Sequence, residues 1–216
     1  MGSALIYGIV NKNIISLDNI FIVEPNKILR KNIKTKGYKV FNNLNDIDLK
    51  KMVIDIILIA VKPQIIGEVL SELKNKMSNN VLIISIVAGK RISYFENCLG
   101  VKKLIIRAMP NTPAKIGKGI TALYSSSRIL DNHRKNINLL FSSTGEVLWL
   151  KKESDMDIVT AISGSGPAYV FKFIESLIES AINAGLDFKT AHILVKHTLF
   201  GASKLALESN ISPKKL

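Results

Sequence analysis

The sequence predicts an α/β protein in which a doubly wound parallel sheet is followed by an all-helical segment. Short aliphatic runs, such as 53–60 and 80–85, have the composition of strands that are covered on both faces. Apolar residues recur at helical spacing between these runs, and beyond about Glu153 only the helical pattern continues. We therefore expect a Rossmann-like domain over residues 1–152 and a helical domain over residues 153–216.

The elements are expected in a regular order along the chain. Apolar periodicity predicts helices at 1–10, 26–35, 65–77, 91–99 and 131–142, and strands at 20–24, 38–41, 53–60, 80–85, 103–107, 120–124 and 147–150. A long helix is predicted to begin at Pro167, since proline fits the first helical turn, and to end near Gly185. Asp187 or Thr190 can cap the helix that follows.

Composition excludes several classes of protein. One cysteine in 216 residues rules out an internal disulfide framework. The formal charge of +13 is carried by scattered basic residues without an arginine-rich run, so we expect no specific nucleic-acid partner. No apolar run reaches the roughly 20 residues that span a bilayer, and no signal peptide is visible, which predicts a cytoplasmic protein off the membrane. The three histidines lack ligand spacing, so we expect no metal.

Distinctive loops follow three of the predicted strands. They are Ala60-Val-Lys-Pro-Gln64, Ser85-Ile-Val-Ala-Gly-Lys90 and Arg107-Ala-Met-Pro-Asn-Thr-Pro-Ala114. Each by itself is better explained as an ordinary rigid turn. Ligands of open α/β sheets bind beyond the carboxyl ends of the strands, however, and three such loops at one edge favour a ligand site.

A fourth distinctive stretch, Thr160-Ala-Ile-Ser-Gly-Ser-Gly-Pro-Ala-Tyr169, leads into the long helix. Serine and glycine before the proline leave the first N–H groups of the helix uncovered and allow close approach. A helix start of this kind can receive a carboxylate or a phosphate. An ordinary well-formed helix start is the alternative, and the loops upstream favour the ligand site.

In combination, Ala60-Val-Lys-Pro63, Met109-Pro-Asn-Thr-Pro113 and Ser163-Gly-Ser-Gly-Pro-Ala-Tyr169 closely resemble pyrroline-5-carboxylate reductase, the last enzyme of proline synthesis. The resemblance covers nearly the whole chain. It implies reduction of 1-pyrroline-5-carboxylate to L-proline with NADPH or NADH. It also implies a homo-oligomer formed through the helices of the C-terminal domain.

The resemblance implies roles for individual residues and assigns none of them to catalysis itself, since a protonated imine already accepts a hydride readily. Glu24 ends a strand where an acidic ribose ligand is expected; it favours NAD over NADP, and a solvated strand end explains it equally well. The residues expected to hold the cofactor are Gly2, Ser3, Glu24, Ala60, Val61, Lys62, Pro63, Ala88, Gly89 and Asn111. Those expected beside the substrate are Glu153, Ser163, Gly164, Ser165, Gly166 and Pro167.

The sequence departs from the family pattern at both ends. Met1-Gly-Ser-Ala4 corresponds to the end of a G-x-G-x-x-G fingerprint, so the first strand and two glycines are absent. The family continues beyond Leu216 into a Ser-Pro-Gly-Gly-Thr loop. We therefore expect a gap in the middle of the sheet, and we hypothesise a shortened reductase that binds NAD(P)H weakly and reduces the imine slowly or not at all.

Two other functions are compatible with the sequence. One is a catalytically crippled remnant that survives as a dimerisation module. The other is a different NAD(P)-dependent dehydrogenase of similar architecture, for example one that acts on β-hydroxy acids and uses a lysine as its acid, for which Lys172 is available. Reduction of the imine with NADH or NADPH distinguishes these hypotheses.

Overall fold

The computed structural model describes residues 1–49, 51–78, 80–101 and 103–216. These residues form two compact units, Met1–Gly164 and Ser165–Leu216. The boundary predicted at 152/153 falls before the last short helices of the first unit, and the assignment of domains to 1–152 and 153–216 stays a prediction.

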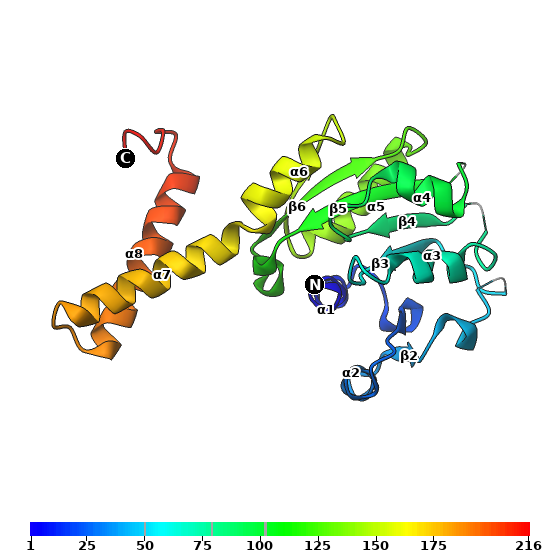
Figure 1. Cartoon of the computed structure of the whole chain (residues 1–216), viewed down its shortest axis with the longest axis horizontal. Coiled ribbons are helices and arrows are strands. Elements are labelled where there is room, and N and C mark those ends of the chain that lie inside the picture. Colours follow the sequence, from blue (N-terminus) through cyan, green and yellow to red (C-terminus); the bar gives the residue numbers. More distant parts are fainter. Residues whose placement is uncertain (50, 79, 102) are drawn as a thin grey trace. The chain divides into compact units, whose positions relative to one another are not determined.

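The first unit alternates strands and helices (Figure 1). Its strands are β1 (Phe21–Val23), β2 (Lys39–Phe41), β3 (Ile56–Ile59), β4 (Leu82–Ser85), β5 (Leu104–Pro110), β6 (Gly119–Ser125) and β7 (Gly145–Trp149). Its α-helices are α1 (Gly2–Asn11), α2 (Lys27–Lys34), α3 (Ile66–Leu73), α4 (Ile92–Leu99), α5 (Asp131–Ser142) and α6 (Asp155–Val159). Three 3₁₀ turns, η1 (Leu17–Asn19), η2 (Leu44–Asp46) and η3 (Thr112–Ile116), and one π-helical turn, η4 (Thr160–Gly164), complete it.

The main sheet has five strands in the order β3-β4-β5-β6-β7. β3, β4 and β5 are parallel, and Ile59, Ser85 and Arg107 lie side by side across them. β6 is antiparallel to β5, because the short turn η3 that joins them cannot make the crossover that a parallel pair requires. β7 pairs with β6 in parallel.

The predicted gap in the sheet is confirmed. β1 and β2 form a separate parallel pair, and no described strand joins them to β3. The two strands have no buried residue between them, whereas all four residues of β4 are buried. The buried core of this unit is therefore formed around the main sheet.

Helices cover both faces of the main sheet, because alternate strand residues belong to two different cores. Leu82, Ile84 and Ile106 pack with residues of α1 and α5, whereas Ile83 and Ile105 pack with residues of α3 and α4. This alternation is the period of two that a strand imposes on its side chains. The result is the three-layer arrangement that the aliphatic runs predicted.

The strand bounds differ from the predictions by a few residues, and the differences at β3 and β5 affect the site most. β3 begins at Ile56, since Val53 is exposed and does not join the ladder. β5 was predicted to end at Arg107, but pairing with β6 extends it to Pro110, which lies opposite Thr121. Proline is tolerated there because it lies at the end of the strand. Arg107, which the sequence placed both at the end of a strand and at the start of the loop after it, lies inside β5.

The second unit is a pair of helices, α7 (Gly166–Asn183) and α8 (Phe188–Glu208). Gly185 adopts a positive φ of 104° after α7, and the Asp187 side chain accepts the Thr190 N–H at the start of α8, as predicted. Their shared core is small: Ile178, Ala191 and Val195 are its buried residues. Large apolar side chains remain exposed on both helices, among them Phe171, Phe173 and Phe200.

Candidate active site

The carboxyl ends of β3, β4 and β5 lie at one edge of the main sheet (Figure 1). Because the three strands are parallel and in register, the residues that follow them emerge together. Ala60–Pro63 follow β3, Ala88 and Gly89 follow β4, and Asn111 follows β5. The tertiary structure thus brings the three distinctive loops to one edge, where ligands of such sheets bind.

The start of α1 lies against the end of β3. A Cβ atom built on Gly2 would lie 3.0 Å from the Cβ atom of Ala60, so a larger residue would crowd this approach. No side chain caps α1; the Ala4 N–H donates to the Met1 carbonyl at 2.9 Å, and the N–H groups of Gly2 and Ser3 are left for water or a ligand. Gly2 and the exposed Ser3 therefore offer an anion the environment of a helix N-terminus.

The backbone after β4 is open to solvent. Gly89 has a φ of 74°, in the left-handed region that favours glycine, and a Cβ atom built on it would meet no atom within 4 Å. Ala88 beside it is exposed, whereas Val87 is buried and anchors the loop. A flat ligand can therefore lie directly against this stretch of main chain.

Asn111 and Ser163 meet at the same edge. The Asn111 Oδ1 atom accepts the Ile120 N–H at 3.0 Å, and its Nδ2 atom donates to the Ser163 Oγ atom at 3.4 Å. Both side chains are half-buried. Because Asn111 donates to the oxygen of Ser163, the hydroxyl hydrogen of Ser163 can be donated to a ligand.

Ser163 lies in the π-helical turn η4, an irregularity that is frequent at functional sites. The neighbouring Gly164 packs closely on β5. A Cβ atom built on Gly164 would lie 2.5 Å from the Cε atom of Met109. Glycine is therefore the residue that lets this turn approach the strand.

Glu153 forms an ion pair inside the first unit. Its Oε1 atom lies 2.8 Å from the Arg107 Nη1 atom and accepts the Ile92 N–H at 2.7 Å. The exposed fraction is 6% for the Arg107 side chain and 23% for that of Glu153. One carboxylate oxygen of Glu153, a residue predicted to lie beside the substrate, is thus engaged by the protein.

Glu24 lies at the end of β1, in the separate two-stranded sheet. Its Oε1 atom accepts the Asn26 N–H at 2.9 Å, and Arg30 donates to its main-chain oxygen at 2.8 Å. Among the contacts of the described residues, none joins Glu24 or Lys62 to Asn111 and Ser163. Their part in a cofactor site stays a prediction.

Three predicted substrate residues, Ser165, Gly166 and Pro167, belong to the second unit. They form the beginning of α7, and no side chain caps this helix start. Pro167 lies in the first turn, as the sequence predicted. The uncapped N–H groups fit the predicted affinity for an anion, and the role of these residues stays a prediction.

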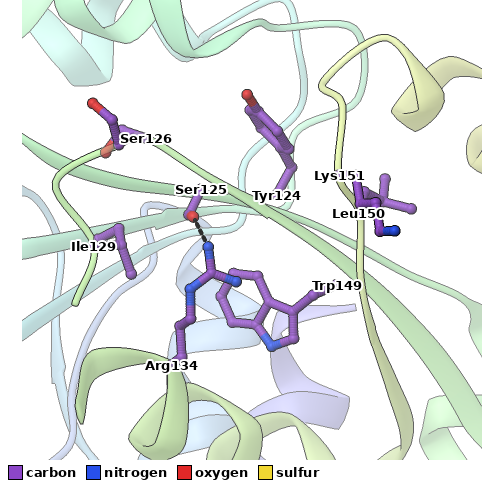
Figure 2. Close-up of a pocket in the computed structure, with 9 residues that line it drawn as sticks. Tyr124, Ser125, Ser126, Ile129, Arg134, Trp149, Leu150 and Lys151 are labelled. Atoms are coloured by element: carbon purple, nitrogen blue, oxygen red, sulfur yellow. Dashed lines mark hydrogen bonds between the residues drawn. The ribbon is translucent and has the colours of Figure 1, made fainter. Parts of the chain in front are cut away.

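A cavity of about 410 Å³ lies away from this edge, beside the end of β7 (Figure 2). Arg134 lies 4.3 Å from the ring centre of Trp149 and donates to the Ser125 Oγ atom at 2.9 Å. Figure 2 shows Tyr124 and Ser126 pointing to the other side of the strand, so the polar groups do not converge. None of the predicted site residues lines this cavity. Its lining is Tyr124, Ser125, Ser126, Ser127, Ile129, Arg134, Trp149, Leu150 and Lys151.

Comparison with known proteins agrees with these features. The family model for pyrroline-5-carboxylate reductase dimerisation matches residues 153–216, and that for NADP oxidoreductase, coenzyme F420-dependent, matches residues 1–89. The pyrroline-5-carboxylate reductase of Methanosarcina acetivorans is 35% identical over 100% of this chain and 79% of its own length. The chain belongs to the pyrroline-5-carboxylate reductase family.

Further reductases show the same extent of similarity. The pyrroline-5-carboxylate reductase of Pasteurella multocida is 30% identical over 97% of this chain and 76% of its own length. The crystal structure of the Plasmodium falciparum reductase, which was determined with NADP bound, is 37% identical and superposes with a TM-score of 0.88, over 100% of this chain and 78% of that one. These reductases support the main hypothesis over the two alternatives.

The lysine that the alternative dehydrogenase would need has another partner. Lys172 donates to the Glu175 Oε2 atom at 2.6 Å on the surface of α7. This hydrogen bond and the charge of Glu175 raise the pKa of the Lys172 ammonium.

Within the described residues, no helix combines the length and the apolar character that a membrane crossing requires.

Three groups that contact the predicted site residues were not predicted from the sequence: the side chains of Arg107 and Met109 and the N–H of Ile92. Arg107 was expected at the junction of a strand and the loop after it, so the face on which its side chain lies was not considered. The available signal was the alternation of Arg107, Met109 and Asn111, which lie two residues apart as side chains on one face of a strand do. The contacts of Arg107 and Ile92 with Glu153 cross 46 and 61 residues of sequence, which periodicity does not reach.

Proposed function

We propose that this protein reduces 1-pyrroline-5-carboxylate to L-proline with NADPH or NADH. The observation that supports the proposal most directly is the contact between Asn111 and Ser163 at the edge where the three loops emerge. It joins the loop after β5 to the turn that precedes α7, which are the two stretches that resemble the family most closely. The similarity to named reductases over the full chain adds independent support.

The reaction needs little from acid–base groups. The reduced nicotinamide supplies a hydride when it is bound, and the imine carbon of the substrate accepts it while the imine nitrogen keeps its proton. The resulting amine takes up one proton from water, and the products are L-proline and the oxidised coenzyme. Because a protonated imine is already a good hydride acceptor, the protein contributes chiefly by placing the reactants.

The described residues fit a dinucleotide at the sheet edge. The uncapped start of α1 at Gly2 and Ser3 would hold a phosphate group, and Ala60, Val61, Lys62 and Pro63 would line the groove beside it. Ala88 and Gly89 would lie against the ligand, since nothing occupies the space above Gly89. In this proposal Glu24 binds the ribose end.

The substrate carboxylate requires donors that are already aligned. We assign the Ser163 hydroxyl to this task, because Asn111 engages the Ser163 oxygen and directs its hydrogen outward. Gly164 allows this hydroxyl to lie close to β5. The start of α7 has no side-chain cap, and the N–H groups of Ser165 and Gly166 are its candidate substrate donors, whereas Pro167 has no N–H.

The test is a turnover assay with the purified chain. Consumption of NADPH and of NADH is followed by absorbance with and without the imine, and proline is identified in the products. We expect coenzyme consumption that depends on the imine and yields equimolar proline. A chain that is folded by circular dichroism and yet forms no proline with either coenzyme would contradict the proposal.

We also propose that the protein works in the cytoplasm and has no specific nucleic-acid partner.

We further propose that the protein forms a homo-oligomer through α7 and α8. The match to a dimerisation family over residues 153–216 supports the oligomer, and so do the exposed apolar side chains of the second unit. Phe171 and Phe200 are 60% and 67% exposed. Light scattering of the wild type and of the double variant Phe171→Ser/Phe200→Ser tests this, since the double variant should dissociate. A wild type that is monomeric at micromolar concentration would refute it.

A further inference from the structure

Three side chains of β5 and of the residue directly after it lie on one face and contact the segment from Glu153 to Gly164. Arg107, Met109 and Asn111 are alternate residues of an extended stretch, because the backbone stays extended at Asn111 with φ −121° and ψ 168°. Arg107 pairs with Glu153, Met109 packs beneath Gly164, and Asn111 donates to Ser163. These three contacts hold the segment against the strand.

We propose that Arg107 and Glu153 are a positioning pair for the imine reduction: their ion pair fixes the segment that contains Ser163 so that its hydroxyl meets Asn111. The inference rests on the proposed function, in which Ser163 binds the substrate carboxylate. Neither residue of the pair needs to touch the substrate or the coenzyme.

The ion pair is the strongest of the three contacts. A single oxygen, Glu153 Oε1, receives a guanidinium N–H from β5 at 2.8 Å and the main-chain N–H of Ile92, the first residue of α4, at 2.7 Å. Charge-assisted hydrogen bonds of this length are about twice as strong as neutral ones. Loss of one partner leaves the other charge poorly solvated, because Arg107 is almost fully buried.

The contact that matters for the reaction is, in contrast, a weak one. Asn111 Nδ2 and Ser163 Oγ are 3.4 Å apart, near the limit of a hydrogen bond. The π-helical turn Thr160–Gly164 that contains Ser163 departs from regular α-helical bonding. A turn of this kind keeps its place only if the chain before it is held, and Glu153 provides that anchor seven residues before Thr160.

The arrangement distinguishes a positioning role from substrate binding by Glu153. The substrate carries a carboxylate, and a second carboxylate facing it would repel it. Arg107 compensates the charge of Glu153 inside the protein. Glutamine keeps an acceptor oxygen for both hydrogen bonds but loses the charge, so Glu153→Gln should hold the segment in the same place less strongly.

The experiment compares Glu153→Ala, Glu153→Gln and Arg107→Met with the wild type, and Glu146→Ala serves as the matched control. Glu146 is an exposed acid of β7. KM and kcat are measured separately for the imine and for the coenzyme. Hydrogen exchange of the amides of 155–164 is measured in the same samples and requires no turnover.

We expect Glu153→Ala and Arg107→Met to raise the KM for the imine about tenfold to hundredfold, as a misplaced binding group does. The KM for the coenzyme should stay within about threefold, and exchange at 155–164 should accelerate. Glu153→Gln should recover part of the loss in both measurements, because it keeps the acceptor but not the charge, and Glu146→Ala should change neither.

Two results would overturn the proposal. If Glu153→Gln is as impaired as Glu153→Ala while exchange at 155–164 stays at the wild-type rate, the charge of Glu153 acts on the substrate directly. If Glu153→Ala changes neither the KM for the imine nor the exchange, the pair positions nothing. A wild type without turnover would count against the proposed function alone, because hydrogen exchange still reports on the position of the segment.

Discussion

The amide of Asn111 bridges two elements: its Oδ1 atom accepts the Ile120 N–H at 3.0 Å, and its Nδ2 atom lies 3.4 Å from the Ser163 Oγ atom. The orientation of the amide follows from these partners, since the Ile120 N–H can only donate. The side chain therefore ties the start of β6 to the turn η4. This explains why an asparagine, with one acceptor and one donor group, suits the position.

Substitution of Asn111 should impair use of the imine. Asn111→Ala removes the donor to Ser163, and we expect the KM for the imine to rise about tenfold to hundredfold. Asn111→Asp keeps the acceptor for Ile120 but draws the Ser163 hydroxyl hydrogen toward itself and adds a negative charge, so its KM should rise further. Steady-state kinetics at saturating coenzyme measure both. Asn138→Asp, at an exposed amide that accepts from Trp149, is the control and should leave KM unchanged.

Replacement of Gly164 should reveal its packing against Met109. In Gly164→Ala the new Cβ atom would lie 2.5 Å from the Met109 Cε atom, and we expect a loss of stability of about 1–3 kcal/mol, near the lower value because this side chain is flexible. The double variant with Met109→Ala should lose less than the sum of the two single losses. Denaturant unfolding measures the coupling, and strictly additive losses would contradict it. Gly201→Ala, where a Cβ atom meets nothing within 4 Å, is the control and should not destabilise.

The two sheets should differ in hydrogen exchange. β1 and β2 are three residues each, pair only with each other among the described strands, and contain no buried residue. An isolated pair of strands is marginally stable in water. We expect the amides of β1 and β2 to exchange at least about a hundredfold faster than those of β4 and β5, through local opening. Exchange followed by mass spectrometry measures this, and equal protection of the two sheets would disprove it.

The start of α8 should respond to acid. Hydrogen bonds from Thr190 lower the pKa of the Asp187 carboxyl in the folded protein. A lowered folded pKa means that Asp187 contributes stability above its unfolded pKa of about 3.9, and that this stability is lost as the pH falls through the folded value. We therefore expect Asp187→Ala at neutral pH to give the same helical circular dichroism signal as the wild type gives at acid pH.

The variant Asp187→Asn separates the effect of helix capping from the effect of the negative charge. Asp187→Asn keeps a good capping residue without a titratable group, so its helix start should not depend on pH between about 2 and 5. Circular dichroism of the wild type and of both variants over this range measures the difference. If the wild type and Asp187→Asn lose helix in parallel, other carboxyl groups cause the acid response.

Periodicity and turn chemistry predicted most of the elements because these are local properties. The aliphatic runs located the strands of the main sheet, and their alternation between two cores follows from the strand period alone. The cap at Asp187 and the glycine after α7 were visible in the sequence for the same reason. The loops at 60–63, 88–89 and 111 were placed at one edge by the rule for parallel strands.

The tertiary structure decided the rest. Whether β5 stops at Arg107 or continues to Pro110 depends on β6, which pairs with it in the opposite direction. That extension places Arg107, Met109 and Asn111 on one face, where Glu153 and Ser163 meet them across 46 and 52 residues of sequence. The sequence by itself thus determined the elements, the loops and the family resemblance. Only the folded chain determined the partner of Glu153, because an ion pair forms where packing brings two distant charges together and excludes water from them.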